Sequence, residues 1–218
     1  MGNEAPGAGP SVPDAFSSHF GAVTGPKSDE NRLCNGVAVR SQPVRIVAGE
    51  LRGRRLVAPD ARTTRPTTDK VREAVFNALA SLDVVVDARV LDLYAGSGAL
   101  GIEALSRGAA HCTFVERDRM AVRAIDENIA VLGLRDRSRV VVADGIVAAP
   151  KLAADLAFAD PPYGFDDWPR LLRAVPGELV VAEADAEIAA PAGWEQGRVK
   201  RYGRTWVTFL HRDGSALP

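Results

Sequence analysis

The chain has 218 residues, 46% of them hydrophobic and 25% charged, and its formal net charge is −1 at pH 7. This length and composition are those of one globular domain with a core of its own, and two cysteines exclude a fold that depends on a disulfide framework. The sequence shows neither an apolar run of membrane-spanning length nor a signal-peptide pattern, so we expect a cytoplasmic protein without a membrane partner.

The N-terminal part divides into two segments of different composition. Residues 1–42 are rich in Gly, Pro, Ala and Ser and show no hydrophobic periodicity, which predicts a disordered tail. Residues 43–62 are predicted to form a small basic β-hairpin, with strands at 44–48 and 55–57. Positions 45–72 hold eight basic and three acidic side chains, an excess that suits contact with phosphate groups.

Residues 63–214 are predicted to form the main domain, because strand-like and helix-like patterns alternate there. A turn around Pro66 leads into a helix that runs to residue 80 with Asp69 as its N-cap. The strands that follow are continuous apolar runs, as in a parallel sheet covered by helices on both faces, and an antiparallel hairpin around Gly203 ends the domain. The predicted strands are 90–94, 112–116, 140–143, 156–159, 179–183, 196–202 and 205–211, and the further predicted helices are 99–106, 119–132 and 168–174.

A glycine-rich turn directly follows the first of these strands. Gly96, Gly98 and Gly101 have the spacing of a dinucleotide-binding loop, and Glu116 follows at about the distance of a ribose-binding acid. A nicotinamide or flavin cofactor is therefore one alternative, and a tight turn without a ligand is another. Asp92 favours a different ligand, because its carboxylate would repel a pyrophosphate but attract an ammonium group. S-adenosylmethionine (SAM) carries such a group.

Three acids that follow three consecutive strands give SAM a predicted set of contacts. Asp92 is expected to orient the methionine end, Glu116 to accept hydrogen bonds from the ribose, and Asp144 to accept one from the adenine amino group. The predicted cofactor site comprises Asp92, Tyr94, Ala95, Gly96, Ser97, Gly98, Gly101, Glu116, Arg117, Asp144 and Gly145.

The tetrapeptide Asp160-Pro161-Pro162-Tyr163 follows the next strand at the same edge of the sheet. Its prolines stiffen the turn and remove two donors, so the Asp160 carboxylate and the Pro161 carbonyl form a pair of acceptors. Such a pair matches the two hydrogens of an aromatic amino group, and Tyr163 offers a surface on which a base can stack. We predict that these four residues are the catalytic site of a methyl transfer that depends on orientation.

Several of these motifs resemble known families. Residues 91–101 resemble the first motif of class I SAM-dependent methyltransferases, and residues 160–163 resemble the (D/N)PP(Y/F) motif of amino-group methyltransferases. Residues 45–56, 64–67 and 70–77 are similar to the bacterial RsmD family, which methylates N2 of a guanine in 16S ribosomal RNA.

The resemblance covers the chain from about Val44 to Arg212. It implies a Rossmann-like α/β fold, in which a seven-stranded, mostly parallel sheet with an antiparallel last strand has helices on both faces. It also implies a basic hairpin that contacts RNA, either 16S rRNA or an assembly intermediate of the 30S subunit. We expect a monomer that needs no metal. The predicted RNA-binding residues are Arg45, Arg52, Arg54, Arg55 and Arg65.

Two alternatives stay open on the sequence alone. The same chemistry would serve an amino methyltransferase that acts on N6 of DNA adenine or on a protein glutamine. The glycine loop would also fit a dinucleotide-binding Rossmann protein, which would leave residues 160–163 without a role.

Overall fold

The computed structural model describes residues 44–58 and 69–215, all of which belong to one compact unit. The tail predicted at residues 1–42 and the turn predicted around Pro66 lie outside the described residues. In the described part of the chain, no helix is both long and apolar enough to cross a membrane.

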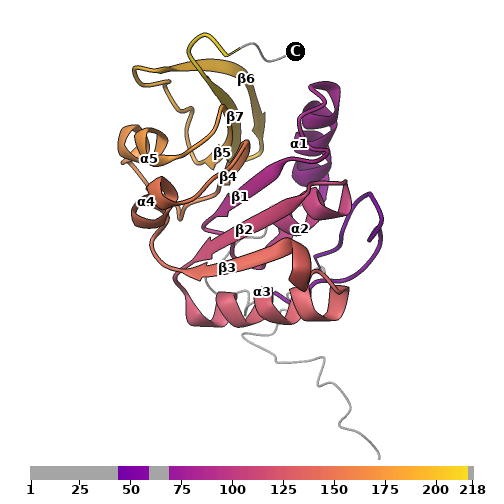
Figure 1. Ribbon diagram of the computed structural model, residues 1–218. Coiled ribbons are helices and arrows are strands. Elements are labelled where there is room, and N and C mark those ends of the chain that lie inside the picture. Colours follow the sequence, from indigo (N-terminus) through magenta and orange to yellow (C-terminus); the bar gives the residue numbers. More distant parts are fainter. Residues whose placement is uncertain (1–43, 59–68, 216–218) are drawn as a thin grey trace, which may run out of the picture. The chain divides into compact units, whose positions relative to one another are not determined.

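Seven strands form one sheet in the order β3-β2-β1-β4-β5-β7-β6 (Figure 1). Neighbours from β3 to β5 pair in parallel, while β7 pairs antiparallel with both β5 and β6. The predicted sheet with its antiparallel last strand is therefore confirmed. The strands are β1 Arg89–Leu93, β2 His111–Glu116, β3 Ser138–Val142, β4 Leu156–Ala159, β5 Leu179–Ala184, β6 Trp194–Tyr202 and β7 Thr205–Arg212.

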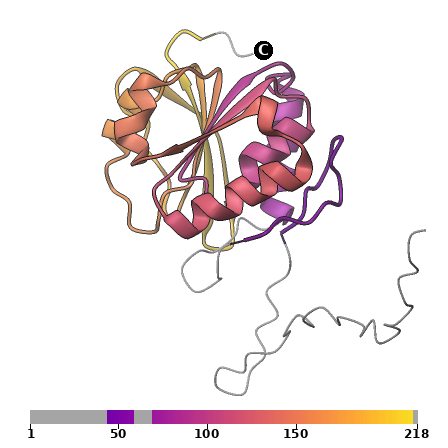
Figure 2. The same ribbon diagram turned by 60° about the horizontal axis from the view of Figure 1, so that its bottom comes forward.

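Helices cover both faces of the sheet, as predicted (Figures 1 and 2). The purple to pink helices α1, α2 and α3 pack on one face, and the orange helices α4 and α5 pack on the other. The helices are α1 Asp69–Ser81, α2 Ala99–Ser106, α3 Arg119–Leu132, α4 Gly145–Ala148 and α5 Trp168–Ala174, with short 3-10 turns η1 Arg135–Arg137 and η2 Ala149–Lys151.

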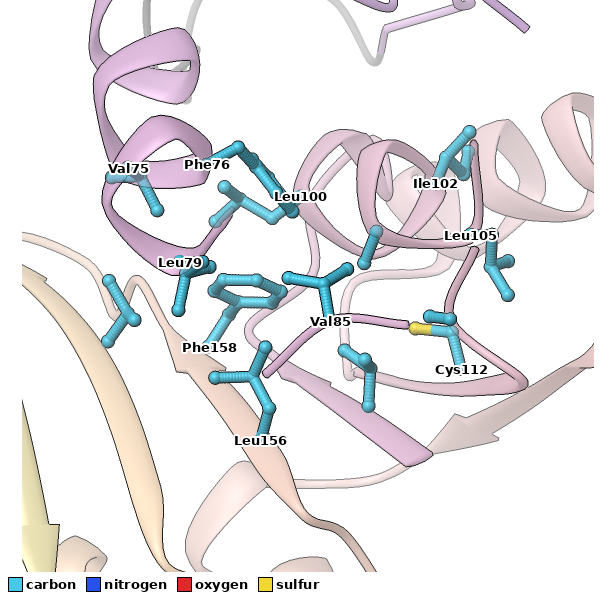
Figure 3. Packing of buried hydrophobic residues seen from close by; sticks show 14 of the residues in the cluster. Val75, Phe76, Leu79, Val85, Leu100, Ile102, Leu105, Cys112, Leu156 and Phe158 are labelled. Atoms are coloured by element: carbon cyan, nitrogen blue, oxygen red, sulfur yellow. The ribbon is translucent and has the colours of Figure 1, made fainter. Parts of the chain in front are cut away.

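Each face of the sheet has its own hydrophobic core. On the α1–α3 side, the rings of Phe76 and Phe158 lie 5.5 Å apart between centroids, and Figure 3 shows Leu79 and Leu156 beside them. On the other side, Trp168 of α5 is buried against the alternate residues of the same strands. Because successive strand residues point to opposite faces, two cores explain why the strands read as unbroken apolar runs.

Local signals set the ends of α3. The side chain of Asp118 accepts hydrogen bonds from the amides of Met120 and Ala121, and Gly133 ends the helix in a left-handed conformation. The predicted bounds of α2, α3 and α5 agree with the structure, whereas the four-residue α4 was not predicted.

The N-terminal segment, residues 44–58, lies beside α2 and α3 and contains no strand (Figure 2). The predicted hairpin is present in a short form. Arg45 and Arg55 form an antiparallel bridge, and the amides of Ile46 and Leu56 donate to the carbonyls of Arg54 and Val44, but neither predicted strand extends over its full length. Outside this pairing, the amides of Val47 and Val57 donate to side chains of α2 and α3, which hold the segment against these helices.

Candidate active site

Four strands end in carboxylates on one face of the sheet. Asp92, Glu116, Asp160 and Glu183 each come two residues after a buried residue that packs against α1–α3, so all four side chains point to that face. Their strands β2, β1, β4 and β5 are adjacent and parallel, which brings the four acids to the carboxyl-terminal edge of the sheet. This is the edge at which open α/β sheets bind ligands.

Asp92 lies beneath the glycine loop and is 2% exposed. Its Oδ2 accepts a hydrogen bond from the Gly101 amide at 2.9 Å. Burial raises the pKa of Asp92 to about 8; the Gly101 amide opposes this shift, and the charges of Asp160 and Glu116 add to it. The three carboxyl groups of Asp92, Glu116 and Asp160 therefore interact electrostatically, and together they favour a positively charged ligand under the loop.

Glu116 connects the glycine loop to the end of β2. Its Oε2 accepts from the amide of Gly96 at 2.9 Å, and its Oε1 accepts from the amides of Arg117 and Asp118 at 2.7 and 2.8 Å. Gly96 and Gly98 both have positive φ, of 57° and 77°, which glycine adopts without strain. Oε2 accepts only one of these hydrogen bonds and can accept a second, so the predicted contact of Glu116 with a ribose stays open.

Tyr94 has a buried hydroxyl with no hydrogen-bond partner among the described residues. The residue itself has positive φ, of 59°, and its ring lies 5.9 Å from that of Phe165 and directly over Gly145, where a Cβ would come within 2.9 Å of Cζ. Burial, with the nearby charge of Asp144, raises the pKa of the hydroxyl to about 12. An unpaired buried hydroxyl next to a glycine-lined turn fits a polar ligand at this position.

Asp144 caps the N-terminus of α4. Its Oδ1 accepts from the Ile146 amide at 3.0 Å, and its Oδ2 lies 3.6 Å from Nη1 of Arg117. These three predicted cofactor residues, Asp144, Arg117 and Gly145, thus lie together next to Tyr94. The predicted adenine contact of Asp144 stays a prediction.

Two other predicted cofactor residues have contacts that shape the loop. Gly101 lies inside α2, where a Cβ would come within 2.4 Å of Phe114 Cε1 and 2.5 Å of Cys112 Sγ. Because glycine has no Cβ, α2 can approach β2 closely at this position. The Ala95 amide donates to the carbonyl of Val115, which fixes the loop to the same strand.

The Asp160–Tyr163 turn begins beside the glycine loop. The Asp160 amide lies 3.5 Å from the carbonyl oxygen of Leu93, the last residue of β1. Pro161 is buried, Pro162 is exposed, and the Tyr163 ring is 59% exposed. The turn therefore presents an aromatic ring to solvent at the end of β4, the strand next to the one that the glycine loop follows.

The basic N-terminal segment is held by three buried side chains. Glu103 of α2 accepts from the amides of Val47 and Ala48 at 2.7 and 3.0 Å, and Ser106 accepts from the Leu51 amide at 3.0 Å. Asn128 of α3 exchanges two hydrogen bonds with the backbone of Val57, at 2.8 and 2.9 Å.

Asn128 also joins this segment to the glycine loop. Its Nδ2 donates to the carbonyl of Ser97 at 3.0 Å, in addition to the carbonyl of Val57. One amide side chain thereby fixes both the cofactor loop and the chain that carries the basic residues. The predicted RNA-binding residues Arg45, Arg52, Arg54 and Arg55 are exposed on this segment, and Arg65 lies outside the described residues.

Three site residues escaped the sequence analysis. Glu183 is 4% exposed at the same edge as Asp160, whereas the sequence alone indicates only that it ends a strand. Arg201, near the end of β6, and Arg204, in the turn between β6 and β7, line a pocket with Tyr163. The sequence shows both arginines beside Gly203, in the predicted turn of the last hairpin. It does not show that this turn lies near Tyr163, because that depends on which strands pair.

A larger hollow, of about 530 Å³, lies at the opposite edge of the sheet. It is lined by the starts of β1, β4 and β5, including the ion pair of Arg89 and Asp155 at 2.7 Å, and by Asp87 and Glu178. Although it is the larger of the two hollows, it is remote from the glycine loop, and we do not assign the chemistry to it.

Comparisons with known proteins agree on one family. Residues 44–211 match the family model described as "Conserved hypothetical protein 95". The chain is 37% identical over 185 residues to ribosomal RNA small subunit methyltransferase D of Escherichia coli, covering 79% of this chain and 92% of that protein. It is also 37% identical to the putative rRNA methyltransferase YlbH of Bacillus subtilis, covering 78% of this chain and 100% of that protein.

A solved structure shares the fold. The putative methyltransferase yhhF from Escherichia coli superposes with a TM-score of 0.69 at 36% identity, covering 78% of this chain and 98% of that one. Residues 44–211, which the family model matches, include the glycine loop, the strand-end acids and the Asp160–Tyr163 turn.

Proposed function

The chain belongs to the RsmD family of SAM-dependent methyltransferases, as its motifs predicted, and we propose that it methylates N2 of a guanine in 16S ribosomal RNA. The methyltransferase activity and the SAM cofactor come with the family. The target atom, the RNA and the residues that act on them are our assignment for this chain.

One observation carries the assignment. Asp160 directly follows β4, the strand that pairs with β1, and lies close enough for its charge to raise the pKa of the buried Asp92. A donor held over Asp92 and an amino group held by Asp160 would therefore meet at one edge of the sheet. The turn also carries Tyr163, whose exposed ring suits a base that has left its stack.

The residues of this chain fit SAM. The buried, unpaired Tyr94 hydroxyl and the glycines at positive φ leave room and a hydrogen-bonding group for a ligand, and Asp92, Glu116 and Asp160 favour a cation. When bound, SAM supplies an electrophilic methyl group on a positively charged sulfur. Asp92 would hold the ammonium end, Glu116 the ribose and Asp144 the adenine.

The Asp160–Tyr163 turn would orient the acceptor. The Asp160 carboxylate and the Pro161 carbonyl accept the two hydrogens of the guanine amino group, which turns its nitrogen lone pair out of conjugation with the ring. Tyr163 stacks on the base and keeps it in the site. Asp160 also stabilises the positive charge that develops on the nitrogen before its proton leaves to solvent. Holding the two reactants in the reactive geometry can lower a barrier by roughly 7–11 kcal/mol.

The RNA would reach this site across the basic segment. Arg45, Arg52, Arg54 and Arg55 are exposed there, and arginines supply affinity for phosphate without reading sequence. We propose that the substrate is 16S rRNA, free or in an assembly intermediate of the 30S subunit, which places the protein in the cytoplasm. We also propose that the protein acts as a monomer.

The test compares Asp160→Ala with Asp166→Ala, an exposed acid of the same loop. Transfer of labelled methyl from SAM to a 16S rRNA transcript and to 30S particles is measured, with base analysis of the product. We expect D160A to lose more than 100-fold in activity, as when a positioned acceptor is removed, while its affinity for S-adenosylhomocysteine stays within a few-fold and D166A behaves as wild type.

Three results would contradict the proposal. Near-wild-type activity of D160A would refute the role of the turn. Methylation of DNA adenine or of a protein glutamine in place of rRNA would favour the other amino methyltransferases. Binding of NADH without binding of S-adenosylhomocysteine would favour a dinucleotide-binding protein.

A further inference from the structure

A second pocket adjoins the Asp160–Tyr163 turn. It has a volume of about 320 Å³ and is lined by Tyr163, Asp185, Arg201 and Arg204. Such a volume is at the lower end of the range of small-ligand sites, roughly 300–1,000 Å³. The basic segment and Asp160 do not line it, so it is a separate feature of the same edge.

Strand pairing brings these residues together from distant parts of the sequence. Ala184 at the end of β5 pairs with Trp206 of β7, and Tyr202 pairs with Thr205 across the β6–β7 turn. The turn therefore lies at the carboxyl-terminal edge, next to Asp185. In the sheet, β6 and β7 lie on one side of β4, and β1 and β2 lie on the other. Helix α2, which holds the basic segment, packs against β1 and β2.

The contacts of the pocket leave positive charge available. Nε of Arg201 donates to the carbonyl of Gly203 at 2.9 Å, and its guanidinium lies 5.6 Å from the ring of Trp206, which holds the side chain in place. Within residues 44–58 and 69–215, neither Arg201 nor Arg204 forms an ion pair.

The acid of the pocket is partly engaged by the backbone. Oδ2 of Asp185 accepts from the Gly164 amide at 3.2 Å, which ties the end of β5 to the loop that carries Tyr163. The lining thus combines two arginines, an exposed aromatic ring and one acid that is bonded to the loop.

We propose that this pocket binds a backbone phosphate of the nucleotide next to the target base, so that the β6–β7 turn is a second RNA contact. The proposal rests on RNA being the substrate. A guanidinium presents paired N–H donors that match phosphate oxygens, and two of them at one pocket favour an anion over a base edge. With the basic segment on one side of Asp160 and this turn on the other, the RNA would be held on both sides of the reacting base.

The test is the salt dependence of RNA binding by the double variant R201A/R204A. The matched control is R173A/R198A, which removes two exposed arginines of α5 and β6 that do not line the pocket. Binding of a 16S rRNA transcript is measured by filter retention between about 50 and 200 mM salt, together with S-adenosylhomocysteine affinity and the kcat and KM of methyl transfer.

We expect R201A/R204A to bind the transcript roughly 10-fold more weakly and to lose roughly 0.7–0.9 from the log–log salt slope for each phosphate contact removed. KM for RNA should rise in proportion, while S-adenosylhomocysteine affinity should not change. R201K/R204K keeps the charges but not the paired donors, so it should recover only part of the affinity.

Each outcome separates this proposal from the function on which it rests. If the double variant and its control show equal affinity and slope, the pocket holds no phosphate, whatever the wild type methylates. If R201A/R204A shows the expected loss of affinity and slope but the wild type transfers no methyl group to the transcript, the phosphate site stands and the target assignment fails. Absence of RNA binding by the wild type would overturn both.

Discussion

The buried carboxyl group of Asp92 should make the stability of the cofactor-free protein fall as the pH rises. Burial, above all, raises its pKa from 3.8 to about 8. Between these values the folded chain holds a proton that the unfolded chain has released, so each pH unit lowers the free energy of unfolding by about 1.4 kcal/mol. Over the whole window the loss is about 6 kcal/mol, which is a large part of the stability of a domain this size.

D92N tests this value, because the amide oxygen still accepts from Gly101 but never ionises. The free energy of urea unfolding of D92N minus that of wild type should grow by about 1.4 kcal/mol per pH unit between about pH 5 and pH 7. D155N is the control. Asp155 lies near the surface, and the hydrogen bond from Arg89 lowers its pKa, so the corresponding difference should stay constant over this range. If the difference between D92N and wild type does not change with pH, the raised pKa of Asp92 is refuted.

Three further substitutions probe the frame of the site. Gly101→Ala should lower the free energy of urea unfolding by about 1–3 kcal/mol through overpacking against Phe114, whereas Gly197→Ala, whose Cβ would meet no atom closer than 3.5 Å, should change it little. Asn128→Asp removes the donor to the Val57 and Ser97 carbonyls; we expect a loss of about 2–4 kcal/mol and weaker S-adenosylhomocysteine binding, unlike the exposed Asn77→Asp. The charge reversal R54E/R55E should weaken binding of a 16S rRNA transcript and flatten its salt dependence. An unchanged slope would mean that these arginines contact no phosphate.

Much of the fold follows from signals that are local in the sequence. Asp118 and Gly133 mark both ends of α3 because an N-cap and a left-handed glycine act on amides and carbonyls only a few residues away. The acids of the site were also visible, since Asp92 and Glu116 lie at the ends of apolar runs whose parallel pairing puts those ends at one edge.

What the sequence did not reveal depends on contacts between distant residues. The N-terminal strands were expected from strand-like pieces on either side of Gly49 and Gly53, but their pairing is limited to a single bridge, and the Val47 amide bonds to Glu103, 56 positions away. Arg201 likewise became part of the site only because β7 pairs antiparallel with β5. Alternation and composition contain no information on such partners.

The charge of the site also bears on which ligand the glycine loop can take. A pyrophosphate at this loop would approach Asp92, Glu116 and Asp160, and its charge would raise the free energy of ionising Asp92 further. A ligand with an ammonium and a sulfonium group has the opposite effect, because it stabilises the ionised form that the fold disfavours. Ionised Asp92 lowers the stability of the ligand-free protein. Binding of a cation restores that stability, and binding of an anion does not. The same spacing of glycines therefore selects SAM here because of the acids beneath it.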